Sequence, residues 1–264
     1  MTLFQSIVIA IVEGLTEFLP VSSTAHIKFT QSIMGIQPEA FEELFDVVIQ
    51  LAAILAVVVI YYKKFFDFKR IGFYIKLIIA LIPAIIIGTV LKKYLGDSLK
   101  NIEFMAWVMV IGGILLLFVD KLFENPTIDS EEKVTNKTAF IIGCGQILSL
   151  VFPGLSRSAA TIITGMSQKL TRTAAAEFSF FLAVPTMFAA SAKSFLDTYK
   201  DHPEVLNTSN ASTLLVGSII AFIVALIAIK FFIGFLQKHG FKVWGIYRII
   251  VGVVMLVLIW KGFL

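Results

Sequence analysis

Long runs of apolar residues recur along the chain and are separated by short polar segments. Each run approaches the roughly 20 residues that a helix needs to cross a bilayer, and we count six full spans. Two further apolar segments, at about 1–34 and 138–168, are interrupted by proline, and we interpret them as re-entrant hairpins. The pattern therefore predicts an all-α integral membrane protein, a polytopic helical bundle with clear spanning runs at 47–62, 77–91, 107–119, 214–232 and 244–260.

Composition excludes a soluble domain of this size. Hydrophobic residues make up 58% of the 264 positions and charged residues 15%, and the mean hydropathy is +0.91. A soluble chain has about 45 to 50% apolar and about 25% charged residues. The single cysteine, Cys144, excludes an internal disulfide. The first apolar segment runs into Glu13 and Glu17 without a small-residue cleavage site, so we expect it to be retained rather than removed as a signal peptide.

Two halves of the chain resemble each other on either side of a polar linker at 124–137. We expect a single membrane domain over 1–264, with repeat one at about 1–123 and repeat two at about 138–264. Each repeat has one proline-broken hairpin and three spans, and an odd number of crossings would invert the second copy. A shift of 133 residues aligns Glu13 with Gln146, Pro20 with Pro153 and Ser23 with Ser156.

The basic residues predict the orientation. The net charge is +4, but lysine and arginine lie mostly in short loops, which is typical of membrane anchoring, so we expect no nucleic-acid partner. If 63–70 is cytoplasmic, that side receives 13 of the 22 basic residues and the other side 7, with Arg157 and Arg248 left within the membrane. The positive-inside rule then places both termini outside.

The first hairpin carries two carboxylates in an apolar setting. Glu13 and Glu17 are four residues apart, so they share one face of a helix. Charged groups inside a membrane are costly and are functional candidates by default. The alternative is an interfacial pair that only ends a helix.

Hydroxyl groups follow the break at Pro20. Ser22, Ser23 and Thr24 stand where a new helix would begin, and the N-terminus of a helix is a site for anions. Taken alone, such a run is ordinary helix capping. His26 is close enough along the chain for one helical turn to bring a base to these hydroxyls, although a lone histidine in a membrane is usually a packing residue.

The second hairpin repeats the arrangement. Gln146 precedes Pro153, and the hydroxyls of Ser156, Ser158 and Thr161 surround Arg157. The planar guanidinium of arginine suits phosphate oxygens, and the alternative is a structural ion pair with Glu13 or Glu17. Two helix N-termini, an arginine, hydroxyls, two carboxylates and a histidine together fit phosphoryl transfer.

The stretches EGLTEFLPVSSTAH and PGLSRSAAT resemble the two signature motifs of the undecaprenyl-diphosphatase family, also known as bacitracin-resistance proteins. FDVVIQLAAILAVVV, GCGQILSLVFPG and EFSFFLAVP extend the resemblance over nearly the whole chain. The resemblance implies a C55 polyprenyl pyrophosphate that is cleaved to its monophosphate for reuse in peptidoglycan synthesis, and a divalent cation, Mg2+ or Ca2+. The family residues carried over are Glu13, Glu17, Ser23, His26, Ser156, Arg157 and Thr161.

We therefore predict an undecaprenyl-diphosphate phosphatase whose substrate lies between the two helix N-termini, on the periplasmic side of a bacterial inner membrane. Glu13 and Glu17 would coordinate the cation or activate a nucleophile, which is water, Ser23 or His26. The other expected partners are membrane lipid and, as an option, a second copy of the chain. The rival hypothesis is a transporter or flippase, since inverted repeats with broken helices are a transporter architecture. The expected substrate-binding residues are Ser22, Thr24, Gln146, Ser156, Ser158 and Thr161, held beside Arg157.

Overall fold

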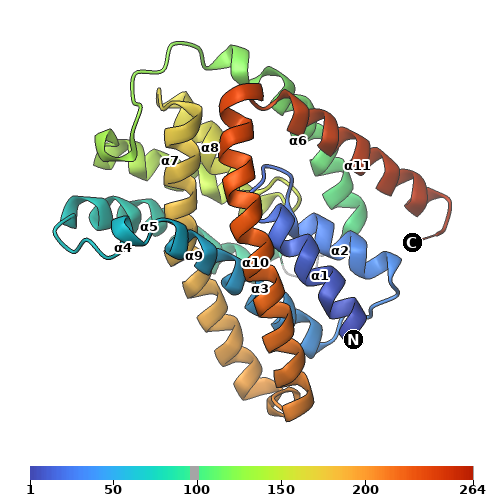
Figure 1. Cartoon of the computed structure of the whole chain (residues 1–264). Coiled ribbons are helices and arrows are strands. Elements are labelled where there is room, and N and C mark those ends of the chain that lie inside the picture. The colour runs from blue at the N-terminus through green and yellow to red at the C-terminus, as the bar shows by residue number, and fades with distance from the viewer. Residues whose placement is uncertain (96–100, 264) are drawn as a thin grey trace.

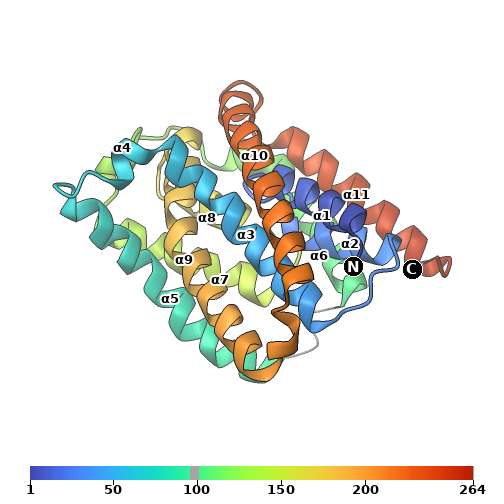
Figure 2. The same ribbon diagram turned by 60° about the horizontal axis from the view of Figure 1, so that its bottom comes forward.

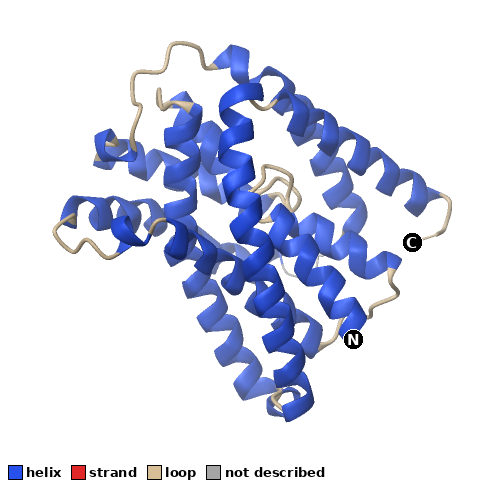
Figure 3. Cartoon of the chain, viewed as in Figure 1, coloured by secondary structure: helices blue, strands red, loops and turns tan. Residues whose placement is uncertain are grey.

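The computed structural model describes residues 1–95 and 101–263, and within these ranges it consists of helices joined by turns and loops (Figures 1 and 3). Lys100, one of the basic residues counted on the outer side, lies outside them. The long helices are α3 (Ala40–Ile60), α5 (Ile71–Leu95), α6 (Ile102–Leu122), α9 (Arg172–Asp201), α10 (Thr208–His239) and α11 (Lys242–Trp260). The shorter elements are α1 (Leu3–Thr16), α2 (Ser23–Ile33), α4 (Tyr62–Phe65), η2 (Glu131–Lys133), α7 (Asn136–Val151), α8 (Arg157–Ser167) and η3 (Pro203–Val205).

The six expected full spans are confirmed as helices of sufficient length and apolarity. They are α3, α5, α6, α9, α10 and α11. In α5 the spanning segment is its first 18 residues, Ile71–Gly88. Many large apolar side chains on these helices point outward, such as Ile78, which is 60% exposed, and Phe118, which is 53% exposed. An outer surface of this kind suits lipid rather than water.

Two hairpins made of shorter helices interrupt the spans, as the proline breaks predicted. The 14-residue α1 and 11-residue α2 form the first, and the 16-residue α7 and 11-residue α8 form the second. Each helix is too short to cross about 30 Å of hydrocarbon at 1.5 Å per residue. Pro20 and Pro153 lie in the loops between the paired helices, so the chain turns back within the bundle.

The second helix of each hairpin starts with the same cap. Ser22 and Ser156 both have positive φ, 71° and 78°, and each side chain accepts a hydrogen bond from a backbone N–H three residues ahead. The equivalent caps are therefore Ser22 and Ser156, and the expected pairing of Ser23 with Ser156 is wrong by one position. The cause is one extra residue after Pro153, where Gly154 has a φ of 97° and an added Cβ would lie 2.7 Å from the Met105 carbonyl oxygen.

The two halves of the chain exchange their packing partners. The first hairpin packs through α1 against α10 of the second half, and the second hairpin packs through α7 against α5 of the first half. In the interior α3 packs against α9, and α6 pairs with α11 on one side of the molecule (Figure 2). Each hairpin is thus buried by a helix from the other half. The inversion of the second repeat stays a prediction.

Ion pairs join the 61–70 segment to the linker. Lys64 Nζ lies 2.7 Å and Arg70 Nη2 3.3 Å from Glu131 Oε1. Lys64 also reaches Glu177 Oε2 at 3.3 Å, at the start of α9. The basic loop, the linker and this end of α9 therefore share one face of the molecule, which agrees with the grouping used for the orientation.

Replacing Glu131 by glutamine is expected to weaken the fold in a pH-dependent way. Burial opposes the charge on Glu131, but hydrogen bonds from Lys64 and Arg70 and the charge of Lys64 outweigh it and lower the pKa of this carboxyl. A carboxyl with a lowered folded-state pKa stabilises the fold above its unfolded-state pKa, and this stabilisation is lost as pH falls through the folded-state pKa. Glu131→Gln should therefore cost about 1 to 3 kcal/mol at neutral pH and little at about pH 3.

Thermal unfolding in detergent at both pH values measures this difference. Asp129→Asn is the matched control, because Asp129 pairs with Lys133 in a fully exposed setting and surface ion pairs contribute little. Equal unfolding temperatures for Glu131→Gln and the unchanged protein at neutral pH would contradict the assignment.

Candidate active site

A cavity of about 230 Å3 lies where the two hairpin loops meet α3 and α9. Gln50 and Thr186, which line it, stand near the middle of α3 and α9, so the cavity lies at mid-depth in the bundle. The lining residues are Glu17, Ser22, Ser23, Thr24, Gln50, Gln146, Ser149, Leu150, Pro153, Gly154, Ser156, Arg157, Thr186, Met187 and Ala190.

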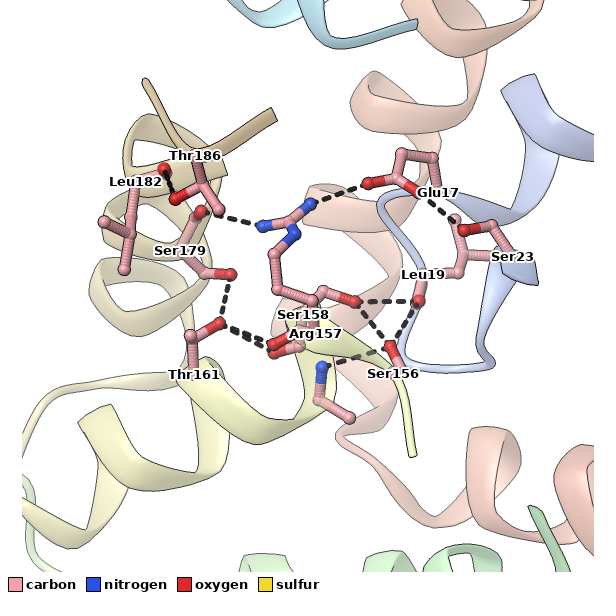
Figure 4. A network of polar contacts seen from close by, with 11 residues as sticks. Glu17, Leu19, Ser23, Ser156, Arg157, Ser158, Thr161, Ser179, Leu182 and Thr186 are labelled. Atoms are coloured by element: carbon pink, nitrogen blue, oxygen red, sulfur yellow. Dashed lines mark hydrogen bonds and ion pairs between the residues drawn. The ribbon is translucent and has the colours of Figure 1, made fainter. Parts of the chain in front are cut away.

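Glu17 joins the two hairpins at this cavity (Figure 4). Its Oε1 lies 2.8 Å from Arg157 Nη2, and its Oε2 accepts a hydrogen bond of 2.5 Å from Ser23 Oγ. Arg157 also donates to the Ser179 carbonyl of α9 at 3.2 Å. Ser23 and Arg157 are the first residues of α2 and α8, so the two helix N-termini converge on one carboxylate. The Glu17 carboxylate therefore contacts a hydroxyl and a guanidinium, and it lies at the positive ends of two helices.

Arg157 retains unused donor capacity. Its Nε has no hydrogen-bond partner within the described residues and is buried, while Nη1 and Nη2 hold Ser179 and Glu17. A buried donor without a partner costs free energy unless a ligand or water satisfies it. The guanidinium therefore fits an anionic ligand in the cavity that it lines.

The hydroxyls of the second hairpin divide into two groups. Ser156 lines the cavity. Ser158 donates to the Leu19 carbonyl at 2.9 Å, and Thr161 bonds Ser179 Oγ at 2.6 Å; neither lines the cavity among the described residues. These two expected ligands instead connect α8 to the first loop and to α9. Of the remaining candidates, Ser22, Thr24 and Gln146 all line the cavity.

Glu13 and Gln146 are buried with unsatisfied polar atoms. Glu13 is completely buried, and neither carboxyl oxygen has a hydrogen-bond donor among the described residues. Its carboxyl lies within interaction distance of the Glu17 carboxyl. Gln146 is 1% exposed, and both atoms of its amide lack partners. Unpartnered buried groups are rare in folded proteins and call for a ligand, ion or water.

The chain matches the bacitracin resistance protein BacA family over residues 6–254. It belongs to this family. A relative named undecaprenyl-diphosphatase from Flavobacterium johnsoniae is 50% identical over 98% of this chain and 96% of its own length. Relatives of the same name from Porphyromonas gingivalis strain W83 and Bdellovibrio bacteriovorus are 48% and 42% identical, each over 99% of this chain and 98% of their own length.

His26 does not line the cavity. Its Nδ1 lies 2.8 Å from the Ser22 carbonyl and its Nε2 2.8 Å from the Tyr247 hydroxyl, and its ring stacks on Tyr247. Because a carbonyl only accepts, Nδ1 carries a proton, and Nε2 shares its hydrogen bond with the tyrosine hydroxyl. Both ring nitrogens are therefore occupied by groups other than Ser23. This arrangement favours Ser23 or water over His26 as the nucleophile of the predicted reaction.

Glu13 and Glu17, the expected metal ligands, could bind a cation together with a phosphate ligand. They do not form a site in which protein side chains alone surround the cation. No group of three or more His, Cys, Asp or Glu side chains that could hold a metal ion occurs in the described residues. Mg2+ is commonly held by one or two carboxylates together with substrate phosphates and water. Glu17 lines the cavity, and Glu13 behind it has two unpaired oxygens. These two carboxylates fit a cation that binds together with a phosphate ligand.

Sequence reasoning missed several polar residues of the site. Gln50, Ser149 and Thr186 line the cavity, and Ser179 bonds both Arg157 and Thr161. Polar residues inside apolar spans were the available signal, because such residues face the bundle interior or a cavity. Which of them meet the hairpins depends on the packing of α3 and α9, which the hydrophobic pattern does not specify.

Proposed function

We propose that the protein is an undecaprenyl-diphosphate phosphatase, which hydrolyses the C55 pyrophosphate to undecaprenyl phosphate and inorganic phosphate. The observation that carries this proposal is the bridge from Glu17 to Arg157 and Ser23, because it places a base, a hydroxyl and a cation in one cavity. The name undecaprenyl-diphosphatase that these relatives carry supports the same substrate. A cavity at mid-depth between apolar helices suits a lipid with a charged head group.

Arg157 and the starts of α2 and α8 would bind the pyrophosphate. A guanidinium can hold two oxygens of one phosphate, and helix N-termini add favourable dipoles for anions. Thr24, Ser22 and Ser156 add hydroxyls around the cavity. Catalysis of phosphoryl transfer rests mainly on such positioning and charge stabilisation.

Ser23 is the nucleophile in the proposed reaction. Its Oγ attacks the terminal phosphorus while Glu17 accepts its proton, and the bond from that phosphorus to the bridging oxygen breaks. The polyprenyl phosphate leaves with the bond electrons. Water then displaces Ser23 from the phosphoserine, the proton on Glu17 returns to Ser23 Oγ, and the proton lost by water leaves on inorganic phosphate. The loose transition state needs only a weak base, which suits a carboxylate paired with arginine.

A divalent cation belongs to the same proposal. Glu13 and Glu17 would hold it, and when bound it would neutralise charge on the pyrophosphate oxygens. The unpaired oxygens of Glu13 support this role.

Phosphate release from a polyprenyl pyrophosphate by the purified protein tests the proposal. We expect turnover that EDTA abolishes and that added Mg2+ or Ca2+ restores. A transporter or flippase would bind the lipid without releasing phosphate. Binding without phosphate release, with the cation present, would overturn the proposed reaction in favour of transport.

We further propose that both termini and the opening of the site face the periplasm. The excess of basic residues on the face that carries 63–70 and the linker supports this orientation. Cysteines introduced at the exposed positions Phe66 and Asn207, in a background lacking Cys144, report the two faces. An impermeant maleimide added to intact cells should label position 207 and leave 66 unlabelled. The reverse labelling would invert the orientation.

A further inference from the structure

Arg248 is a completely buried cation in the middle of α11. Its guanidinium donates to five backbone carbonyls and to no carboxylate within the described residues. The acceptors are Pro20 at 3.1 Å, Leu155 at 2.7 Å, Gly154 at 2.8 Å, Val108 at 3.3 Å and Met109 at 3.4 Å. Burial of a charge costs free energy unless the charged group is well hydrogen-bonded. Among the described residues, the dipoles of these backbone carbonyls compensate the Arg248 charge.

The five acceptors come from three separate segments. Pro20 belongs to the loop of the first hairpin, Gly154 and Leu155 to the loop of the second, and Val108 and Met109 to α6. The guanidinium therefore ties both loops to each other and to the α6–α11 pair. Only arginine offers five N–H donors in a fixed plane, whereas lysine offers three.

Arg248 does not line the cavity but lies directly behind its walls. Pro20 is three residues before Ser23, and Leu155 is two residues before Arg157. The described peptide bonds are all trans, so carbonyls drawn toward Arg248 direct the N–H groups of Val21 and Ser156 away from it. The guanidinium thereby fixes the backbone orientation immediately before each helix N-terminus.

We infer that Arg248 is a positioning residue that holds the two hairpin loops in register, so that Ser23 and Arg157 meet at Glu17. This inference rests on the proposed function for its effect on turnover. The structural part of the inference is that Arg248 fixes the position of α2 relative to α8, and this part does not depend on the reaction. Misplacement of reacting groups by about 1 Å costs about 10²-fold in rate, so a small shift of either loop should be visible in kcat.

Gly112 allows Arg248 to be displaced without removing its charge. A Cβ at Gly112 would lie 2.5 Å from Arg248 Nη2 and 3.1 Å from Cζ. Gly252→Ala is the matched control, since a Cβ there would meet Ala106 O and Val110 Cγ2, both at 2.8 Å, on the same α6–α11 interface but away from the guanidinium. The two variants crowd one interface and differ in whether the added Cβ meets the Arg248 guanidinium.

The experiment measures kcat, KM and the separation of the hairpins for Gly112→Ala, Gly252→Ala and Arg248→Lys. Nitroxide labels at Ile33 and Ser167, which end α2 and α8 and are exposed, report that separation by pulsed electron resonance in a background lacking Cys144. We expect Gly112→Ala and Arg248→Lys to broaden the distance distribution and to lower kcat by about 10- to 10²-fold, with smaller changes in KM. Gly252→Ala should lower thermal stability, because its Cβ meets a backbone carbonyl oxygen at 2.8 Å, but it should change the distance distribution and kcat less than Gly112→Ala does.

Unchanged distances and kcat in Gly112→Ala would overturn the inference, and so would equal losses in Gly112→Ala and Gly252→Ala, because the interface as a whole would then be responsible. If Arg248→Lys fails to fold, the two glycine variants decide alone. If the unchanged protein releases no phosphate, the proposed function fails, and the distance distributions still test the role of Arg248.

Discussion

Glu17→Gln is expected to abolish phosphate release while the protein remains folded. The amide cannot accept the Ser23 proton, and it cannot compensate the Arg157 charge that faces it at 2.8 Å. Loss of a general base costs about 10² to 10⁴-fold in rate, and misplacement of Arg157 adds to this loss. Single-turnover phosphate release, measured beside thermal unfolding on the same preparation, gives the two quantities.

Glu13→Gln is the matched control for this substitution. The 133-residue shift aligns Glu13 with Gln146, so we expect an amide to be compatible with this position of the fold. The loss of turnover should be smaller and should depend on the concentration of added divalent cation. Normal turnover by Glu17→Gln would remove this residue from the reaction.

Arg157→Lys should lose a large part of kcat, and Arg157→Ala should lose more. Lysine keeps the charge but lacks the planar pair of donors that now reaches Glu17 and Ser179. Groups that stabilise developing charge affect kcat because they bind the transition state more strongly than the ground state. Removal of such donors costs about 10² to 10³-fold.

The rival role for Arg157 is a structural ion pair, and it predicts a different result. Stability would then fall, while the surviving folded fraction would keep its kcat. Thermal unfolding and single-turnover release on the same samples separate the two roles. A destabilised Arg157→Ala protein with full activity would exclude Arg157 from catalysis.

The spans and hairpins could be predicted because their signal is local. Each spanning run is long and apolar, and each break contains a proline. The residue that caps the second helix of the second hairpin was harder to predict. The extra residue at Gly154 moves the cap to Ser156, and this loop conformation depends on the close approach of Gly154 to Met105. The sequence shows the motif, but close backbone approach is a property of packing.

The directions of individual side chains could be predicted only in part. Glu17, Ser23 and Arg157 meet because all three belong to the two loops and the helices that follow them. Thr161 instead faces Ser179, since the phase of α8 is set by its contact with α9. Arg248 was visible as a charge within a span, but its five acceptors come from segments up to 228 residues away along the chain.

The exchange of packing partners constrains how the chain matures in the membrane. The first hairpin packs against α10, which ends at His239, so its burial waits until most of the chain has been synthesised. Until then Glu13 of α1 and Glu17, which follows it, have only lipid, water or insertion machinery around them. Neither half separated from the other contains the helix that covers its own hairpin. A protein made of one half with the same contacts would therefore need a second copy of itself to cover its hairpin.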